Sequence, residues 1–280
     1  MLLPADTFAP RLPAALVAPT RPVLPEAGHR EPASRQAKRM PATAPDFSPQ
    51  RTADGSLTLH SAQLGERYHS THGAVQESTH VFLKNGLEHV GKAQVDVLEV
   101  GLGTGLNLLL TWIRCLEGKL TVRYTALEPF PVSAEQLTTL DHCNELAWPG
   151  LHEPFIARMT SEQEEPWEAL GGLSFQKLPL AVQDLKAEAV ADVIYFDAFG
   201  PNTQPEMWTL DVFQCMFRAL RPGGVLVTYC AKGEVRRTMQ EAGFSVERLP
   251  GPPGKREMLR GRKGSLIADN VDPCAGNAVR

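Results

Sequence analysis

This 280-residue sequence has no long hydrophobic run. Its longest apolar stretches, such as the leucines around 106–110, are broken by polar residues or glycines and fall far short of the roughly 20 residues that a membrane-spanning helix needs. The N-terminus also lacks the basic segment, apolar stretch and small-residue cleavage site of a secretory signal. We therefore expect a cytoplasmic protein with no membrane partner.

Cysteine is scarce and the net charge is small. The five cysteines are widely spaced and form no CxxC pair, so they lack the usual zinc and redox spacings and favour reduced thiols. We expect no metal site. The formal net charge of -4 gives no global attraction to the phosphates of a nucleic acid. Any contact with RNA therefore needs a local basic patch.

Proline is abundant at one end of the chain. Ten of the 23 prolines lie in the first 50 residues, mixed with alanine and scattered charges, and this segment lacks the periodicity of a packed core. The composition predicts order from near residue 55. We predict four parts: a disordered Pro/Ala-rich extension (1–52), a segment of short strands and a helix (53–92), a catalytic α/β domain (93–266) and a flexible tail (267–280).

After residue 56 the hydrophobic pattern becomes regular. Alternating apolar residues predict strands after Ser56, and an amphipathic helix is predicted over 74–90. Strand candidates then alternate with helical stretches, which is typical of βαβ units. The predicted strands are 95–101, 121–129, 178–184, 191–199 and 221–231, followed by an antiparallel pair at 244–250 and 257–263. The fold class is therefore α/β and Rossmann-like, with a mostly parallel sheet and a C-terminal antiparallel strand pair.

A glycine-rich loop, EVGLGTGLN, follows the first of the alternating strands. Glycine lets backbone amides approach a ligand where a side chain would clash. The spacing is GxGxG with an acid two residues before the first glycine, whereas a dinucleotide site has GxGxxG. This spacing favours an adenosyl amino acid over NAD. The candidate cofactor contacts in this loop are Glu99, Gly101, Gly103, Thr104, Gly105 and Asn107.

Three acids stand at predicted strand ends, where ligands bind in open α/β sheets. Glu128 can accept hydrogen bonds from ribose hydroxyls, and Asp184 can accept one from the adenine amino group. Asp197 is expected beside the cofactor, where it can orient an amine and help remove its proton. Phe199 can wall the pocket or stack on a base, and Tyr68 and Glu77 are candidates for closing over the cofactor.

Several longer motifs resemble one known family. They are RYHSTHGAVQESTHVFLKNGL, LEVGLGTGLN, YFDAFGPNTQPEMWTLDVF and LRPGGVLVTYCAKGEVRRTMQEAGFSVERLPGPPGKREMLRG, and they cover roughly residues 56–262 in order. The family is that of the tRNA wobble-uridine aminomethyl methyltransferases, the methyltransferase half of the bifunctional MnmC enzymes, which also occurs alone as MnmD. Where the family often reads FAP, this chain has Phe199-Gly200-Pro201.

The resemblance implies a reaction and a partner. The expected activity is methylation, from S-adenosyl-L-methionine, of the exocyclic amine of 5-aminomethyl-(2-thio)uridine at the tRNA wobble position. By motif position, Glu99, the 101–105 loop, Glu128 and Asp184 would contact the cofactor, and Asp197 would lie at both the cofactor and the reacting amine. The sequence has no second glycine-rich βαβ unit for a flavin-dependent oxidase, so no oxidoreductase activity is expected.

The anticodon stem-loop of tRNA is the expected partner. Between Lys232 and Lys263 there are nine basic and four acidic residues, enough for phosphate contacts, although an exposed tail can be basic without binding RNA. Aromatic residues beside a buried strand are also more often core than contact residues. The candidate substrate or RNA contacts are Pro201, Trp208, Lys232, Arg236, Arg237, Lys255 and Arg256.

Three alternatives stay open at this point. A methyltransferase or aminopropyltransferase acting on a small-molecule amine would use the same fold and Asp197. An NAD-dependent oxidoreductase is disfavoured by the GxGxG spacing. A catalytically silent RNA-binding module would keep the basic patch without binding the cofactor.

Overall fold

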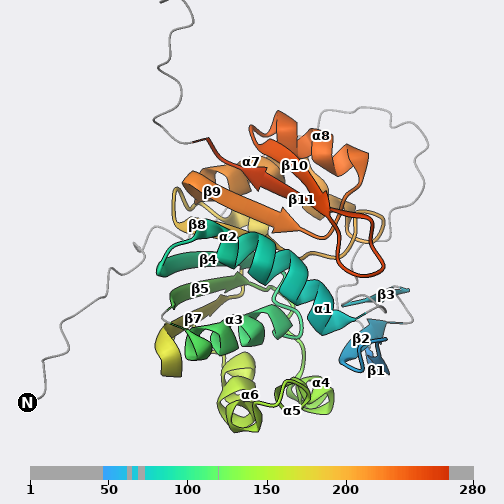
Figure 1. The fold of residues 1–280 in the computed structure, drawn as a ribbon, viewed down its shortest axis with the longest axis vertical. Coiled ribbons are helices and arrows are strands. Elements are labelled where there is room, and N and C mark those ends of the chain that lie inside the picture. The colour runs from blue at the N-terminus through green and yellow to red at the C-terminus, as the bar shows by residue number, and fades with distance from the viewer. Residues whose placement is uncertain (1–46, 62–64, 69–72, 119, 265–280) are drawn as a thin grey trace, which may run out of the picture.

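The computed structural model describes residues 47–61, 65–68, 73–118 and 120–264. Its main feature is an eight-stranded sheet with the order β10-β11-β9-β8-β4-β5-β7-β6 (Figure 1). The parallel strands are β4 (Gln94–Val100), β5 (Thr121–Leu127), β7 (Leu173–Leu178), β8 (Ala191–Phe196) and β9 (Leu220–Thr228). The antiparallel strands are β6 (Trp167–Glu168), β10 (Ser245–Pro250) and β11 (Glu257–Arg262). The predicted fold class and C-terminal antiparallel pair are confirmed.

The strand order reverses between β4 and β8. Strands β5 and β7 follow β4 on one side, whereas β8 and β9 lie on the other. Val100 pairs with both Leu127 and Phe196, so β4, β5 and β8 end at the same level. The loops that follow these three strands therefore meet at one edge of the sheet, at the point where open α/β folds bind ligands.

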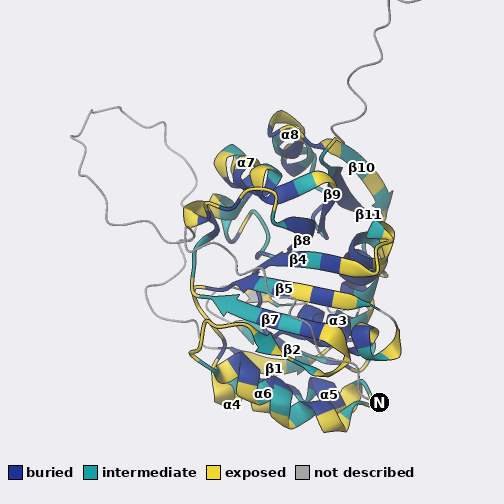
Figure 2. Cartoon of the chain, turned by 90° about the vertical axis from the view of Figure 1, so that its left-hand side faces the viewer, coloured by how far each residue is buried: buried dark blue, intermediate teal, exposed yellow. Residues whose placement is uncertain are grey.

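Helices cover both faces of the sheet (Figure 1). One face packs against a long N-terminal helix and α3 (Leu106–Glu117), and the other packs against α7 (Leu210–Ala219) and α8 (Gly233–Glu241). Buried residues concentrate in the central strands and the inner faces of these helices (Figure 2). Smaller helical elements are α4 (Ala134–Leu140), α5 (His142–Glu145), η3 (Pro149–Leu151), α6 (His152–Thr160), η4 (Leu170–Gly172), η5 (Val182–Asp184) and η6 (Pro205–Trp208). Within the described ranges, no helix is long and apolar enough to cross a membrane.

The predicted helix over 74–90 is present, with a π-helical middle. It comprises α1 (Ala74–Ser78), η2 (Thr79–Leu87) and α2 (Glu88–Val90). Gly86 faces the sheet so closely that a Cβ atom there would lie 3.0 Å from Val227 Cγ2 and 3.2 Å from Tyr195 Cε1. The absence of a side chain at this position lets the helix approach the strands, and it fixes α1 near the ligand-binding edge.

The ordered structure begins earlier than the sequence predicted. Strand β1 (Ser48–Arg51) lies inside the predicted disordered extension of residues 1–52 and pairs with β2 (Leu57–Ser61), which pairs with β3 (Glu66–Arg67). Pro49 concealed this strand in the sequence, but proline is tolerated in an edge strand such as β1. The rest of the predicted extension and the predicted tail lie outside the described residues.

The third parallel strand was predicted in the wrong place. The structure has β7 at Leu173–Leu178, and the predicted segment 178–184 contains a loop and the 3-10 turn η5 instead. Leu178 is followed by Pro179, which cannot donate a ladder hydrogen bond. Val182, one of the apolar residues that suggested a strand here, is buried from the turn. Asp184 consequently does not end a strand.

Candidate active site

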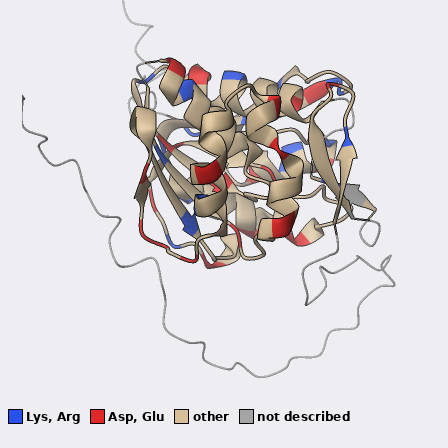
Figure 3. Ribbon diagram, turned by 90° about the horizontal axis from the view of Figure 1, so that it is seen from below, with Lys and Arg blue, Asp and Glu red and all other residues tan. Residues whose placement is uncertain are grey.

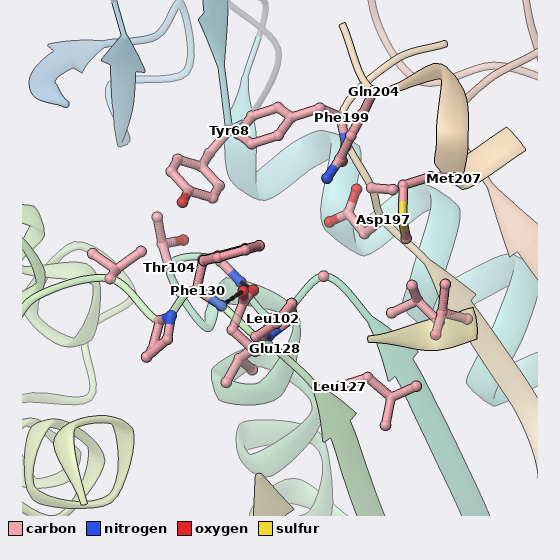
Figure 4. Close-up of a pocket in the computed structure, with 18 of the residues that line it drawn as sticks. Tyr68, Leu102, Thr104, Leu127, Glu128, Phe130, Asp197, Phe199, Gln204 and Met207 are labelled. Carbon is pink, nitrogen blue, oxygen red and sulfur yellow. Dashed lines mark hydrogen bonds between the residues drawn. The ribbon is translucent and has the colours of Figure 1, made fainter. Parts of the chain in front are cut away.

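A cavity of about 300 Å³ lies at the carboxyl ends of the parallel strands (Figure 4). Its walls come from the loops after β4, β5 and β8, together with residues beside the small N-terminal sheet. This volume is at the lower end of the range of about 300–1,000 Å³ that is typical of small-molecule sites. The lining residues that the sequence predicted as site residues are Tyr68, Gly101, Gly103, Thr104, Asn107, Glu128, Asp197 and Phe199.

The turn after β4 requires glycine at two positions that line the cavity. Gly101 has φ 87° and Gly103 has φ 50°, which are left-handed conformations. A Cβ atom on Gly101 would lie 2.7 Å from the Asp197 carbonyl oxygen, and one on Gly103 would lie 2.7 Å from the Tyr68 ring. The loop therefore brings bare backbone to the cavity wall, as predicted.

Gly105 has a packing role at the start of α3. It precedes α3 with φ 76° and does not line the cavity. A Cβ atom there would lie 2.7 Å from Met159 Sδ in α6. Gly105 thus allows α3 to begin close against α6, and the cofactor contact at this position stays a prediction.

Glu128 follows β5 and ties two loops together at the cavity. Its Oε2 accepts a 3.0 Å hydrogen bond from the Gly103 amide, and its Oε1 accepts a 2.9 Å bond from the Phe130 amide (Figure 4). Burial raises the pKa of this carboxyl, and the backbone hydrogen bonds oppose the rise. Since a carboxylate oxygen has more than one acceptor site, Glu128 can also accept from a ligand hydroxyl.

Asn107, in the first turn of α3, joins two acids through one amide group. Its Nδ2 donates to Glu99 Oε1 at 2.9 Å and to Asp197 Oδ2 at 2.8 Å. Glu99 is completely buried and does not line the cavity, and it is linked to the lining residue Asn107 by this hydrogen bond. Burial raises the pKa of Glu99 well above its usual value, and the charge of Asp197 adds to this rise.

Asp197 follows β8 and is half-buried at the cavity wall (Figure 4). Burial, with a smaller contribution from the negative charge of Glu77, raises the pKa of this carboxyl to about 7. The hydrogen bond from Asn107 and the positive charge of Lys255 act in the opposite direction. A group with a pKa near neutrality is suited to accept and release a proton at physiological pH.

Aromatic rings form one wall of the cavity. The Tyr68 ring centroid lies 4.9 Å from that of Phe47 and 5.1 Å from that of Phe199. Across the cavity, Phe130 is 47% exposed and lies near Glu128 (Figure 4). Phe47 was missed in the sequence because it lies in the proline-rich segment, and Phe130 was missed because it belongs to no motif. These faces suit a flat organic ring.

Two polar atoms at the cavity have no partner within the described residues. Thr104 Oγ1 and Asn107 Oδ1 are both buried and make no hydrogen bond there. A buried polar atom without a partner is costly, and a ligand can remove that cost. Together with the glycine turn and Glu128, these atoms fit a ligand that carries hydroxyl and amino groups, such as an adenosyl amino acid.

Known proteins resemble this chain over most of its length. The "tRNA 5-methylaminomethyl-2-thiouridine biosynthesis bifunctional protein MnmC" of Cupriavidus necator is 34% identical over 238 residues, covering 78% of this chain and 35% of that protein. The protein of the same name from Nitrosospira multiformis is 32% identical over 222 residues, covering 72% and 35%. The chain is a homologue of the MnmC proteins. It spans about a third of the length of these relatives.

A solved structure and a family model agree with this assignment. The crystal structure of MNMC2 from Aquifex aeolicus has a TM-score of 0.62 and 28% identity, covering 81% of this chain and 72% of that one. A family model described as S-adenosyl-L-methionine-dependent methyltransferase matches residues 173–264. The fold of this MnmC homologue is that of S-adenosyl-L-methionine-dependent methyltransferases, and the cofactor prediction is confirmed.

Three predicted site residues of the MnmC homologue lie away from the cavity. Asp184 is exposed, and its neighbour Gln183 lines the cavity instead. Pro201 is in the loop after Phe199 but is not a lining residue. Trp208 is buried, and its indole Nε1 donates a 2.8 Å hydrogen bond to the Phe199 carbonyl. Trp208 therefore supports the cavity wall from the core and is not available to RNA.

The predicted basic contacts divide into paired and available groups. Lys255 Nζ lies 2.5 Å from Glu77 Oε1, and Lys232 Nζ donates to Asn202 Oδ1 at 2.7 Å. By contrast, Arg237 and Arg256 are exposed and make no ion pair with another described residue. Acidic and basic residues are interspersed on the face shown in Figure 3, so any phosphate site must be local. The fifth candidate, Arg236, is half-buried beside Gln240, its guanidinium Nη1 3.4 Å from Gln240 Oε1.

Proposed function

We propose that this chain methylates the exocyclic amine of 5-aminomethyl-(2-thio)uridine at the wobble position of tRNA, using S-adenosyl-L-methionine and giving 5-methylaminomethyl-(2-thio)uridine. The observation that carries the proposal is the position of Asp197, a carboxyl with a pKa near 7 at the wall of the cofactor-sized cavity. The names of the curated relatives supply the class of product. We further propose that residues 93–266 form the methyltransferase domain, preceded by the family segment at 53–92.

The cofactor has a defined place in this proposal. S-adenosyl-L-methionine, when bound, supplies a methyl group on a positively charged sulfur that a neutral amine can attack. Glu128 holds the ribose hydroxyls, while Thr104 and Asn107 offer their unpaired oxygens to hydroxyl or amino groups. The bare backbone at Gly101 and Gly103 allows close approach.

The acceptor nucleoside is held and activated by the opposite wall. The rings of Tyr68 and Phe199 stack on or enclose the uracil ring, since base stacking on aromatic faces needs no particular sequence. The Asp197 carboxylate accepts a hydrogen bond from the amine and aims its lone pair. As the amine nitrogen forms its bond to the methyl carbon, the bond from that carbon to sulfur would break and the neutral thioether would leave. The surplus amine proton passes to Asp197, which later releases it to water.

The anticodon stem-loop is the proposed partner. Arg237 lies in α8 and Arg256 in the turn before β11, and both side chains are exposed. Phosphate contacts from these two residues would position the RNA without reading its sequence.

The test is transfer of labelled methyl from S-adenosyl-L-methionine to tRNA that lacks this modification. The aminomethyl and carboxymethylaminomethyl forms are supplied separately, and the nucleosides are identified after digestion. Methylation of the aminomethyl form alone supports the proposal, and Asp197→Asn serves as the inactive control. If the tRNA stays unlabelled while the cofactor still binds, the acceptor proposal is wrong, and small-molecule amines become the acceptors to assay.

A further inference from the structure

A largely buried ion pair lies beside the cavity but outside its lining. Lys255, on the turn between β10 and β11, places Nζ 2.5 Å from Oε1 of Glu77 in α1. The two side chains are 29% and 8% exposed. Taking two charges out of water costs free energy that their attraction often only just offsets, so stability alone is a weak reason for such a pair.

Tyr229 links the ion pair to the loop that carries Asp197. Lys255 Nζ lies 4.0 Å from the centroid of the Tyr229 ring, within the range of a cation–π contact. The Tyr229 hydroxyl donates a 2.9 Å hydrogen bond to the carbonyl of Ala198, the residue after Asp197. Tyr229 also lines the cavity. Contacts therefore run from Glu77 of α1, through Lys255 of the hairpin and Tyr229, to the loop that carries Asp197.

We propose that Glu77 and Lys255 are positioning residues that set how readily Asp197 takes up a proton. The Glu77 carboxylate favours the protonated form of Asp197, and the Lys255 ammonium favours the ionised form. This inference rests on the proposed function, in which Asp197 must be ionised to receive the amine proton. Because the two charges act on Asp197 in opposite directions, its proton affinity depends on the difference between their effects. The ion pair between Glu77 and Lys255 fixes the position of each charge.

The other groups around Asp197 do not supply this balance. Asn107, from α3, is neutral. Glu99, from β4, and Tyr124, from β5, are both buried, and burial raises the pKa of each, which favours their uncharged forms. Glu77 and Lys255 are thus the fixed charges of opposite sign that act on Asp197, the first raising its pKa and the second lowering it.

The hairpin has other attachments that hold it in place without Lys255. His80 Nε2 lies 2.8 Å from the Pro250 carbonyl oxygen, and Arg260 donates to the Asn85 carbonyl. Strand β11 of the hairpin is also hydrogen-bonded to β9 of the central sheet. A neutral residue at position 255 therefore leaves the hairpin docked on the helix, and the variant can be measured as a folded protein.

The experiment measures the protonation of Asp197 directly. The full chain is labelled with ¹³C at aspartate carboxyl groups, and the Asp197 signal is assigned by its loss in Asp197→Asn. Titration is then followed by NMR in the wild type, Glu77→Gln and Lys255→Gln. We expect the midpoint to move down in Glu77→Gln and up in Lys255→Gln, each by about half a pH unit or more.

Two further variants make the result specific. Lys255→Arg keeps the charge and should restore a midpoint close to that of the wild type. Glu257→Gln removes a carboxylate of the same hairpin whose partner, Arg248, lies 3.7 Å away and exposed, and it should leave the midpoint unchanged. If Glu77→Gln does not fold, the upward shift in Lys255→Gln and its reversal in Lys255→Arg decide the question.

The titration separates this inference from the proposed function, because it needs neither cofactor nor tRNA. Shifts of opposite sign support the pair as the control on Asp197, and the acid limb of the methylation rate should move in the same two directions. Shifts of one sign, or none in Lys255→Gln, overturn the inference even if methyl transfer is intact. Absence of methyl transfer in the wild type, with opposite shifts present, overturns the proposed function alone.

Discussion

The side-chain amide of Asn107 donates a 2.8 Å hydrogen bond to Asp197 Oδ2. The same nitrogen donates to the buried carboxyl of Glu99, so one neutral group bridges the two acids. This arrangement fixes Asp197 at the cavity wall while α3 holds the amide rigidly. The orientation of the proposed proton acceptor is therefore set by the same helix that begins at the glycine turn.

Asp197→Asn should abolish most of the methyl transfer. The asparagine keeps the shape of the side chain and can still accept from Asn107, but it cannot take up the amine proton. We expect the rate to fall by about 100-fold or more, as when a general base is lost, while cofactor affinity measured by calorimetry changes little. A rate within a few-fold of the wild type would remove Asp197 from the mechanism.

The same substitution should stabilise the fold at alkaline pH. The pKa of Asp197 is about 7 in the folded protein and about 3.9 in an unfolded chain, so the folded state holds this proton more tightly. The tighter binding of this proton adds to the free energy of unfolding. The contribution is complete below about pH 4 and is lost as the pH rises through about 7. Asp197→Asn should therefore melt at least about 2 °C above the wild type at pH 8 and close to it at pH 4. Equal melting temperatures at pH 8 would contradict the raised pKa.

Gly103→Val should prevent cofactor binding. A Cβ atom at this position lies 2.7 Å from two atoms of the Tyr68 ring, and φ is 50°, which a β-branched residue rarely adopts. We expect cofactor affinity to fall by about 100-fold, measured by calorimetry on folded protein. Gly150→Ala is the matched control, because no heavy atom lies within 4 Å of its added Cβ and its φ is not positive. Unchanged affinity in Gly103→Val would show that the turn can move away from the ligand.

The parts of the site that could be predicted from sequence depend on local geometry. Gly101, Glu128 and Asp197 each follow a strand, and parallel strands deliver their carboxyl ends to one edge whatever the details of packing. The hydrophobic pattern therefore located them together. The prediction that Asp184 ends a strand was wrong, because the strand ends at Leu178, just before Pro179. Asp184 lies in an exposed turn instead.

The parts that could not be predicted depend on contacts distant in sequence. Glu77 and Lys255 are 178 positions apart, and no periodicity relates a helix residue to a hairpin turn. Trp208 was read as a possible substrate contact because it follows the Asp197 loop. Its ring instead packs edge-on against Phe196 at 5.1 Å, which only the tertiary structure could show.

Neutralising Arg237 and Arg256 together should weaken tRNA use without changing the chemistry. Both side chains are exposed and make no ion pair with another described residue, so they are free to contact phosphates. For the double glutamine variant we expect KM for tRNA to rise several-fold with kcat unchanged. The salt dependence of binding should become shallower by about two in its logarithmic slope, because each phosphate contact contributes about 0.9.

Arg114→Gln provides the control for this charge removal. Arg114 is also partly exposed, but it lies in the last turn of α3, which begins at the glycine turn and runs away from the cavity, and it pairs with Glu88 at 2.9 Å. Its loss should leave both KM and the salt slope unchanged. If KM and the salt slope are also unchanged in the double variant, tRNA approaches the cavity over another face. If Arg114→Gln weakens tRNA binding as much per charge as the double variant does, the attraction comes from the overall charge of the protein and not from a localised phosphate site.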